Sequence, residues 1–269
     1  DPASPLAARR AVVCVDDEWG EKMAQVAERP VRVGTRGQAD LDVSAQQLAV
    51  EDTGAQEIAI ELRGTRHTFR LPMPGAFNVA NAALAVALAD AVGVKAGEFI
   101  AGLEAASVPG RMERIDCGQD FVAVVDYAHK PAAVAAVLDT LRGQVQGRVA
   151  VAVGAGGDRD ASKRPLMGAE AARRAELVIV TDDNPRTEDP ATIRAAVLAG
   201  AREAAEPGTE VREVGDRRNA IEQLVAWARP GDAVIVVGKG HEVGQIIGDT
   251  THHFDDREEM RRALTGGGE

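Results

Sequence analysis

The sequence has few aromatic residues and almost no cysteine. Phe, Trp and Tyr make up 3% of the 269 residues, so the hydrophobic cores must consist mainly of Ala, Val, Leu and Ile. The two cysteines, Cys14 and Cys117, lie far apart and show neither a Cys-x-x-Cys nor a Cys/His spacing. This pattern argues against a disulfide framework and a structural zinc site, and it is typical of a cytoplasmic protein.

The sequence also lacks an excess of basic residues and a long apolar run. The formal net charge is −11 and the isoelectric point is about 5.0, so we expect no nucleic-acid partner. The most apolar stretch, residues 79–94, contains Asn81 and Asp90 and is too short to span a membrane. With 45% hydrophobic residues, the chain is long enough for two ordinary domains with their own cores.

The first part of the chain shows mixed periodicity. Short apolar runs and a long alternating stretch predict strands, and an Ala-rich segment followed by Gly93 predicts a helix. The predicted strands cover 11–15, 31–36 and, with turns at Gly54 and Gly64, 41–72; the predicted helices cover 77–93 and about 95–106. Pro109 and Gly110 then indicate a domain junction, so the predicted domains are 1–108 and 109–269.

The second domain repeats a strand–helix rhythm. Continuous apolar runs rich in β-branched residues alternate with helical segments, which predicts an α/β domain with a Rossmann-like, mostly parallel sheet. The predicted strands end in four polar loops, DYAHK (126–130), GAGGDRD (154–160), TDDNPR (181–186) and GKGHE (238–242). Because the carboxyl ends of parallel strands meet at one edge of a sheet, we expect these loops to form the ligand site.

The TDDNPR loop has residues suited to amino-acid recognition. Pro185 disfavours a helical Asn184, so the chain turns out of the sheet. Asp183 and Asn184 can then accept hydrogen bonds from an ammonium group, and Arg186 can bind a carboxylate through two hydrogen bonds. An Asx-type turn stabilised by its own side chains explains the same residues equally well.

The other loops allow both a structural and a functional interpretation. The spacing of GAGGDRD departs from the dinucleotide fingerprint, and with Arg159 nearby it favours a carboxylate ligand over a dinucleotide. A tight turn is the alternative. Helix capping is the default role for Asn78 and Asn81, and a strand terminus is the default setting for His129.

Six motifs occur in a fixed order along the chain: PGAFNVANAALA, GRMERI, VVDYAHKP, VGAGGDRDASKRP, TDDNPRTEDP and VGKGHE. In order and spacing they resemble the Mur ligase family over essentially the whole chain, and within it the members that add diaminopimelate. The resemblance implies that residues 1–108 are the C-terminal part of a P-loop-type α/β ATPase domain whose P-loop is missing. It also implies that residues 109–269 are the Rossmann-like domain that binds the incoming amino acid.

The resemblance further implies a reaction. An enzyme of this kind joins meso-2,6-diaminopimelate to UDP-N-acetylmuramoyl-L-alanyl-D-glutamate during peptidoglycan synthesis, using ATP and Mg²⁺ and an acyl-phosphate intermediate. It is expected to be a cytoplasmic monomer. The lysine that is carbamylated to hold magnesium in the family would precede residue 1, so the metal ligands are expected mostly outside these residues.

The family's functional positions can be carried over residue by residue. The resemblance implies that the nucleotide is bound by Asn81, Arg111, Asp126, His129 and Lys130, with Arg111 and His129 also catalytic, and the amino acid by Arg159, Asp183, Asn184, Arg186, Gly238 and Glu242. The family usually has Thr and Asp where this chain has Lys130 and Ala132. Arg186 is the expected selector for diaminopimelate, since members that add lysine tend to have Ala there.

Three other functions remain as alternatives. A sister ligase of the same fold would add lysine or D-Ala-D-Ala, although the Asp-Asn-Pro-Arg sequence at 183–186 argues against both. A dinucleotide-binding oxidoreductase would use the glycine-rich loop and the acidic residues Asp182 and Asp183. A non-catalytic module would bind an amino acid without turnover.

The missing P-loop yields a direct prediction. Because no GxxxxGK[ST] motif is present, residues 1–269 alone are expected neither to hydrolyse ATP nor to form product. A phosphate-release assay on the purified chain, with both substrates present, checks this. Steady ATP turnover would contradict the expectation.

Overall fold

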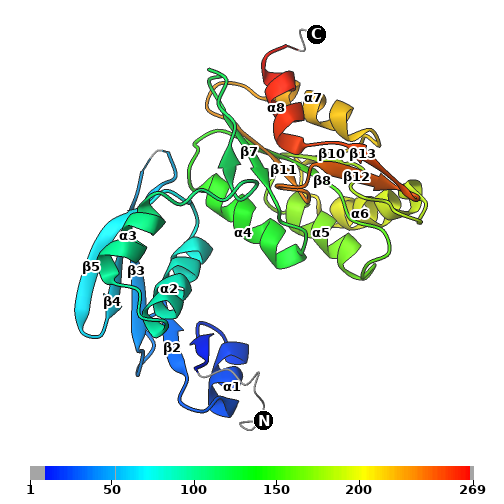
Figure 1. The fold of residues 1–269 in the computed structure, drawn as a ribbon. Coiled ribbons are helices and arrows are strands. Elements are labelled where there is room, and N and C mark those ends of the chain that lie inside the picture. Colours follow the sequence, from blue (N-terminus) through cyan, green and yellow to red (C-terminus); the bar gives the residue numbers. More distant parts are fainter. Residues whose placement is uncertain (1–9, 52, 267–269) are drawn as a thin grey trace. The chain divides into compact units, whose positions relative to one another are not determined.

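The computed structural model describes residues 10–51 and 53–266 of the chain. The chain divides into two compact units, Asp1–Ser107 and Val108–Glu269, which we call unit 1 and unit 2. Both units combine helices with a sheet, so the predicted α/β class is confirmed (Figure 1).

Unit 1 contains a five-stranded sheet of order β1-β2-β3-β4-β5. Strands β1 to β3 pair in parallel and β3 to β5 pair antiparallel, which confirms the strands predicted over residues 41–72. The turns between the antiparallel strands contain Gly54 and Gly64, whose φ angles of 82° and 74° favour glycine. The elements are β1 (Val12–Cys14), α1 (Glu18–Val26), β2 (Val31–Gly34), β3 (Val43–Val50), β4 (Gln56–Leu62), β5 (Thr65–Leu71), α2 (Ala76–Ala91) and α3 (Ala96–Glu104).

Two features of unit 1 differ from the expectation. Helix α1 was not predicted, because its sequence is largely polar; Asp17 begins it by accepting a hydrogen bond from the Gly20 N–H at 2.8 Å. Neither asparagine of the GAFNVAN motif caps α2, whose N-cap is Gly75. Asn78 instead donates to the Pro74 carbonyl at 2.8 Å, and Asn81 donates to the Asn78 side chain at 3.2 Å.

Unit 2 contains a six-stranded sheet of order β10-β9-β8-β11-β7-β6. All neighbouring strands are parallel except the short β6, which is antiparallel to β7, so the predicted mostly parallel sheet is confirmed. The elements are β6 (Glu113–Arg114), β7 (Val122–Asp126), α4 (Pro131–Arg142), β8 (Val149–Val153), α5 (Lys163–Ala172), β9 (Leu177–Val180), α6 (Pro190–Ala204), β10 (Glu210–Glu213), α7 (Arg217–Trp227), β11 (Ala233–Val237), β12 (Gly244–Ile247), β13 (Thr250–His253) and α8 (Asp256–Leu264).

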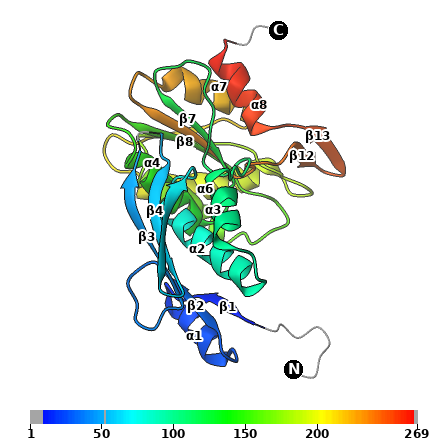
Figure 2. The ribbon, with the colours of Figure 1, turned by 60° about the vertical axis from the view of Figure 1, so that its left-hand side comes forward.

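Helices cover both faces of this sheet. Figures 1 and 2 show α4, α5 and α6 on one face and α7 and α8 on the other. Alternate strand residues such as Val125, Ile179 and Val236 pack in one core cluster with Leu224 of α7 and Met260 of α8. Both faces of the central strands are therefore apolar, which is why their sequences are continuous hydrophobic runs.

The strand order brings the four polar loops predicted from the sequence to the same end of the sheet, at the carboxyl ends of the strands. Strand β11, the last long strand in the sequence, inserts between β7 and β8, so that Val237 pairs with both Asp126 and Val153. Strand β9 lies on the far side of β8, with Val180 paired with Val153. The loops that follow β7, β8, β9 and β11 therefore leave the sheet side by side.

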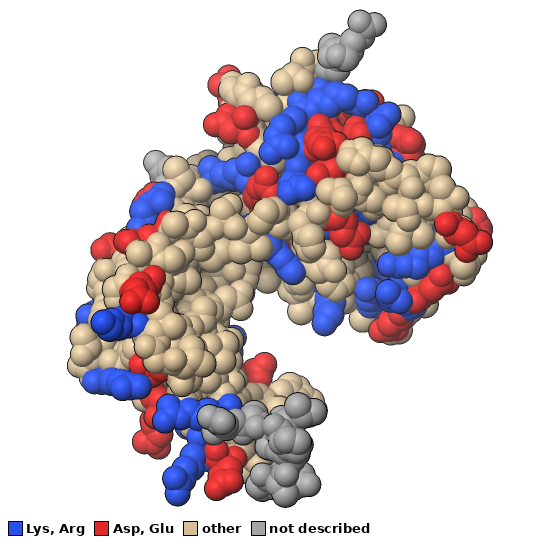
Figure 3. Space-filling view, in the orientation of Figure 1, with Lys and Arg blue, Asp and Glu red and all other residues tan. Residues whose placement is uncertain are grey.

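The surface of unit 2 has no purely basic face over α7 and α8. Figure 3 shows Lys and Arg side chains mixed with Asp and Glu in that region. Arg218 contacts Glu259 at 2.8 Å, and Arg262 contacts both Glu222 and Glu259. These cations of the two helices are therefore paired with acidic side chains of the same helices.

One fully buried arginine joins the ends of two strands. Arg217, the first residue of α7, forms a bidentate ion pair with Asp256 of α8 at 2.7 and 2.8 Å, and both side chains are 0% exposed. The same guanidinium donates to the carbonyls of Asp182, just after β9, and Val237, the last residue of β11. It therefore fixes the exits of β9 and β11 relative to each other across β8.

We predict that breaking this ion pair destabilises unit 2 strongly. Arg217→Met leaves the Asp256 charge buried without a partner and should lower the free energy of unfolding by about 3–5 kcal/mol. Arg218→Met removes the neighbouring, exposed ion pair and should cost less than about 1 kcal/mol. Denaturant unfolding of both variants checks this; equal losses would contradict it, and adding Asp256→Leu to Arg217→Met should recover part of the loss.

Candidate functional site

A hollow of about 500 Å³ lies at the carboxyl ends of the strands of unit 2. Its walls come from the loops after β7, β8, β9 and β11 and from the start of α5. The residues that line it are Tyr127, His129, Lys130, Pro131, Gly156, Arg159, Asp160, Lys163, Asp183, Asn184, Arg186, Gly238 and Glu242. The structure thus brings together all six positions expected to bind the amino acid, along with His129 and Lys130.

Arg186 is anchored by its backbone and reaches the hollow with its side chain. Its φ angle is 53°, and its N–H and C=O bond to Ile246 and Gly248 of the β12–β13 hairpin at 3.0 and 2.7 Å. Nη1 donates to the Gly157 carbonyl at 2.8 Å. Nε and Nη2 have no hydrogen-bond partner in the part of the chain that the structure describes, so they can bind a carboxylate.

The Asn184 side chain forms three hydrogen bonds within the protein, which the sequence does not predict. Its Oδ1 accepts from Lys239 Nζ and from the Ile246 N–H, both at 2.9 Å. Its Nδ2 donates to Glu242 Oε2 at 2.9 Å. Both lone pairs of Oδ1 are in use, so the expectation that Asn184 accepts from a ligand ammonium is corrected: Asn184 positions Glu242 instead.

Asp183 is the acceptor that remains open. Its side chain is nearly buried and lines the hollow, yet among the described residues none donates a hydrogen bond to its carboxylate. Gly238 makes this placement possible, because a Cβ there would overlap Asp183 Oδ2 and its φ of 118° is itself a glycine conformation. This carboxylate can therefore accept hydrogen bonds from a cationic group.

Two lysines of the site were not predicted as site residues. Lys239 is fully buried behind Asn184 and Glu242; burial lowers its pKa, and the Asp183 charge opposes that change. Lys163 lines the hollow and donates to the His129 carbonyl at 3.0 Å, and burial lowers its pKa as well. Their motifs, Gly-Lys-Gly and Ser-Lys-Arg-Pro, were the available signal, but a lysine between polar residues normally indicates an exposed charge.

The residues expected to contact the nucleotide are only partly gathered. Arg111 is exposed, and its guanidinium lies 4.4 Å from the ring centre of Tyr127, which also packs against His129. Asp126 does not line the hollow. It is 3% exposed, and its two oxygens accept from the Met112 and Ala128 N–H groups at 2.7 Å. Burial raises its pKa, while those two hydrogen bonds oppose the change.

Asn81 belongs to unit 1 and is therefore not among the residues that surround the hollow in unit 2. It is exposed on α2. Among the described residues no cluster of three or more His, Cys, Asp or Glu side chains could hold a metal ion. No helix in the described ranges is long and apolar enough to cross a membrane.

The glycine-rich loop after β8 is used for packing. A Cβ at Gly157 would overlap the carbonyl oxygen of Pro185, so only glycine lets the loops after β8 and β9 approach. The Gly157 N–H donates to the Asn184 carbonyl at 2.9 Å, and the Asp158 N–H donates to Glu188 at 2.6 Å. These N–H groups are not free to bind a pyrophosphate, which argues against a dinucleotide.

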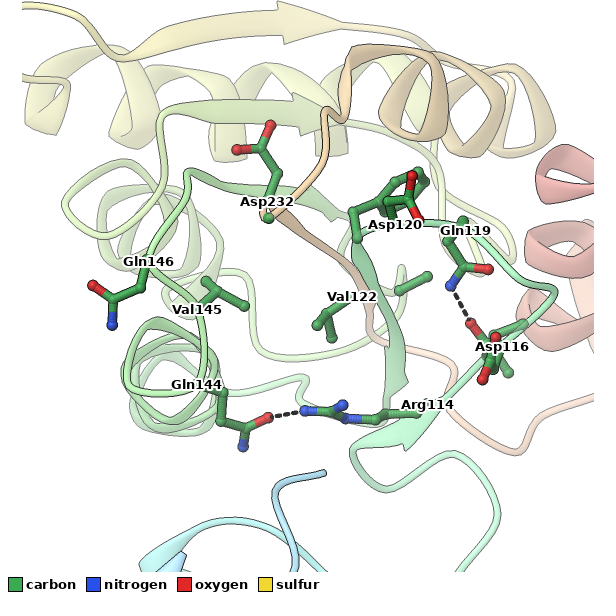
Figure 4. Close-up of a pocket in the computed structure, with 13 residues that line it drawn as sticks. Arg114, Asp116, Gln119, Asp120, Val122, Gln144, Val145, Gln146 and Asp232 are labelled. Atoms are coloured by element: carbon green, nitrogen blue, oxygen red, sulfur yellow. Dashed lines mark hydrogen bonds between the residues drawn. The ribbon is translucent and has the colours of Figure 1, made fainter. Parts of the chain in front are cut away.

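A second hollow of about 470 Å³ lies at the other end of the strands of this sheet, near their amino ends. Figure 4 shows Arg114 donating to Gln144, and Gln119 bonded to the backbone beside Asp116. Asp232, also in its wall, is bonded to Arg148. These side chains hold loops together at the amino ends of the strands.

Comparison with known proteins places both units in one family. The model of the Mur ligase middle domain matches residues 4–89, and that of the Mur ligase glutamate ligase domain matches residues 110–240. The chain is 60% identical over 266 residues to UDP-N-acetylmuramoyl-L-alanyl-D-glutamate–2,6-diaminopimelate ligase of Corynebacterium glutamicum, covering 97% of this chain and 51% of that protein. Identity to the ligase of the same name from Streptomyces avermitilis is 43% over 264 residues, covering 97% and 52%.

Solved structures of similar fold include a ligase of the same name as these relatives. A structure of a UDP-N-acetylmuramoyl-L-alanyl-D-glutamate–2,6-diaminopimelate ligase matches with a TM-score of 0.58 and 33% identity, covering 96% of this chain and 53% of that one. Folylpolyglutamate synthase of Mycobacterium tuberculosis, complexed with ADP and AMPPCP, matches with a TM-score of 0.65 at 22% identity over 87% and 53%, which shows a common fold. The chain spans about half the length of the curated relatives it matches.

We predict that Gly157 is needed for the approach of the two loops. Gly157→Ala should lower the free energy of unfolding by about 1–3 kcal/mol, because the new methyl group displaces the Pro185 carbonyl. Gly143→Ala is the matched control: Gly143 ends α4 with a φ of −69° and has room for a Cβ, so its change should stay within about 0.5 kcal/mol. Similar unfolding curves for the two variants would contradict this account.

Proposed function

The chain belongs to the Mur ligase family, and from this we propose that it is the amino-acid-binding unit and part of the ATP-binding unit of a diaminopimelate-adding ligase. The reaction joins meso-2,6-diaminopimelate to the terminal carboxylate of UDP-N-acetylmuramoyl-L-alanyl-D-glutamate. ATP phosphorylates that carboxylate, an amino group of diaminopimelate attacks the acyl phosphate, and an amide and phosphate are released along with ADP. The product is a peptidoglycan precursor.

One observation carries the assignment of the amino acid. The same hollow is lined by Arg186, with its open N–H groups, by the open carboxylate of Asp183 and by the carboxylate of Glu242. A carboxylate and an ammonium on one carbon atom are the complementary groups, and diaminopimelate carries such a pair at each end. The remaining cations of the wall, Arg159 and Lys163, suit the second carboxylate.

The residues around Tyr127 suit the phosphate chemistry. Arg111, His129 and Lys130 are cationic or can become so, and they lie at or next to the mouth of the hollow. In that place they would neutralise charge on the acyl phosphate while the amine attacks. We assign Asp126 a supporting part in this, since its carboxylate holds the turn that carries Arg111.

The nucleotide contacts follow from the family. We propose that Asn81 contacts the ATP base and that Arg111 contacts the phosphates. Magnesium would neutralise phosphate charge when bound, but the described residues offer no cluster for it, so we derive no step from the metal. Because the proposed substrates are nucleotides made inside the cell, we also propose a cytoplasmic enzyme, which we take to act as a monomer.

The alternatives fit the site less well. A lysine-adding ligase has no carboxylate at the far end of its substrate to pair with Arg186, and a ligase for D-Ala-D-Ala has no second ammonium for Asp183. A dinucleotide oxidoreductase needs free N–H groups in the loop after β8, where Gly157 and Asp158 are already bonded. Calorimetric titration with NAD(P)H should therefore show no binding.

We predict that Arg186 selects diaminopimelate over lysine. A guanidinium left without its partner costs about 2–5 kcal/mol, and about 1.4 kcal/mol corresponds to tenfold in affinity. Arg186→Ala should therefore reduce the preference for meso-diaminopimelate over L-lysine by at least about tenfold in calorimetric titrations. Arg202→Ala, on the exposed side of α6, should leave the preference unchanged. A preference that persists in Arg186→Ala would show that another residue is the selector.

A further inference from the structure

Lys239 is the one fully buried lysine among the described residues, and it lies directly behind the hollow. It follows Gly238 at the end of β11, and its side chain is 0% exposed. Nζ lies 2.9 Å from Asn184 Oδ1 and 3.5 Å from Glu242 Oε2. A buried ammonium is costly unless it is paired, so this placement must be compensated by the groups around it.

The charges around Lys239 come from four elements. Asp183 follows β9, Glu242 follows β11, Arg217 begins α7 and Asp256 begins α8. Arg217 and Asp256 form their own bidentate pair. Lys239 and Arg217 both interact with the charges of Asp183 and Glu242, which line the hollow. Lys163, at the start of α5, also interacts with the Asp183 charge.

The contacts of Lys239 also fix the direction of one amide. Lys239 and the Ile246 N–H both donate to Asn184 Oδ1, so the Asn184 NH₂ group must point the other way, toward Glu242. Glu242 Oε2 is thereby held by Asn184 and faces Lys239. Its Oε1 has no hydrogen-bond partner in the described ranges and stays available to a ligand.

Resting on the proposed function, we propose that Lys239 is a positioning residue that makes the hollow selective for a ligand ammonium group. It holds Glu242 and Asn184 in one arrangement and compensates one of two neighbouring carboxylates. Its charge favours the carboxylate form that a ligand ammonium contacts.

The loss of Lys239 should change how ammonium binding depends on pH. Without the cation, the repulsion between two carboxylates in a partly desolvated site is less well offset, so the loss of Lys239 favours uptake of a proton by one of them. That proton then competes with the ligand ammonium. Ammonium recognition should weaken at pH 7 and recover as the pH rises and the proton leaves, whereas a loss of general structure would not recover.

The test compares two ligands by calorimetric titration of the whole chain. One is meso-diaminopimelate and the other is 2-aminopimelate, which keeps both carboxylates but lacks one ammonium group. Lys239→Met should reduce the preference for diaminopimelate by roughly tenfold or more at pH 7, with partial recovery at pH 8.5. Leu224→Ala creates a cavity in the core under α7, and Leu224 does not line the hollow, so this change should lower the unfolding temperature but leave the preference unchanged.

The outcomes separate the two proposals. If the unaltered chain fails to bind diaminopimelate, the proposed function is wrong. If it binds and Lys239→Met keeps the same preference at pH 7, the role of Lys239 is wrong. Should Lys239→Met fail to fold, calorimetry of the unaltered chain at pH 7 in buffers of different ionisation enthalpy decides: almost no proton release on binding is expected, and release of about one proton would overturn the proposal.

Discussion

The arrangement of unit 2 depends on the buried guanidinium of Arg217. A parallel sheet fixes the strands but leaves their exit loops free to diverge, and the exits of β9 and β11 are separated by β8. Arg217 binds the backbone carbonyl at each exit and is itself held by Asp256. A charge this deep is stable only with full pairing, so the two exits and the start of α8 have one compatible arrangement.

Contacts within the protein also position the side chains that line the hollow. Glycine at 157 and 238 lets the loops after β8, β9 and β11 approach within contact of Pro185 and Asp183. Asn184 Oδ1 accepts two hydrogen bonds within the protein and its Nδ2 donates to Glu242, while Asp183, Arg186 and Glu242 Oε1 keep unfilled hydrogen-bonding capacity among the described residues. A site that combines open carboxylate oxygens with part of an open guanidinium is prepared for an amino-acid ligand before that ligand arrives.

Much of this was accessible from the sequence. Continuous apolar runs revealed the parallel strands, and the polar loops at their ends identified the hollow. Helix α1 was missed because it is short and only Ala24 of it is buried, although Asp17 caps its start. Arg217 and Lys239 were missed because charged residues in Asp-Arg-Arg-Asn and Gly-Lys-Gly normally lie in solvent, and their burial depends on partners 39 and 55 residues away in the chain. Side-chain hydrogen-bond direction, which changed the role of Asn184, cannot be read from residue type.

The central claim is that Arg186 and Asp183 face the two charged groups at one end of a diamino diacid. A crystal structure of the chain with meso-diaminopimelate tests it most directly. The account predicts a carboxylate of the ligand against Nε and Nη2 of Arg186, with the ammonium on the same carbon between Asp183 and Glu242. A ligand bound at the opposite edge of the sheet, or one in the hollow with Arg186 turned into solvent, would contradict it.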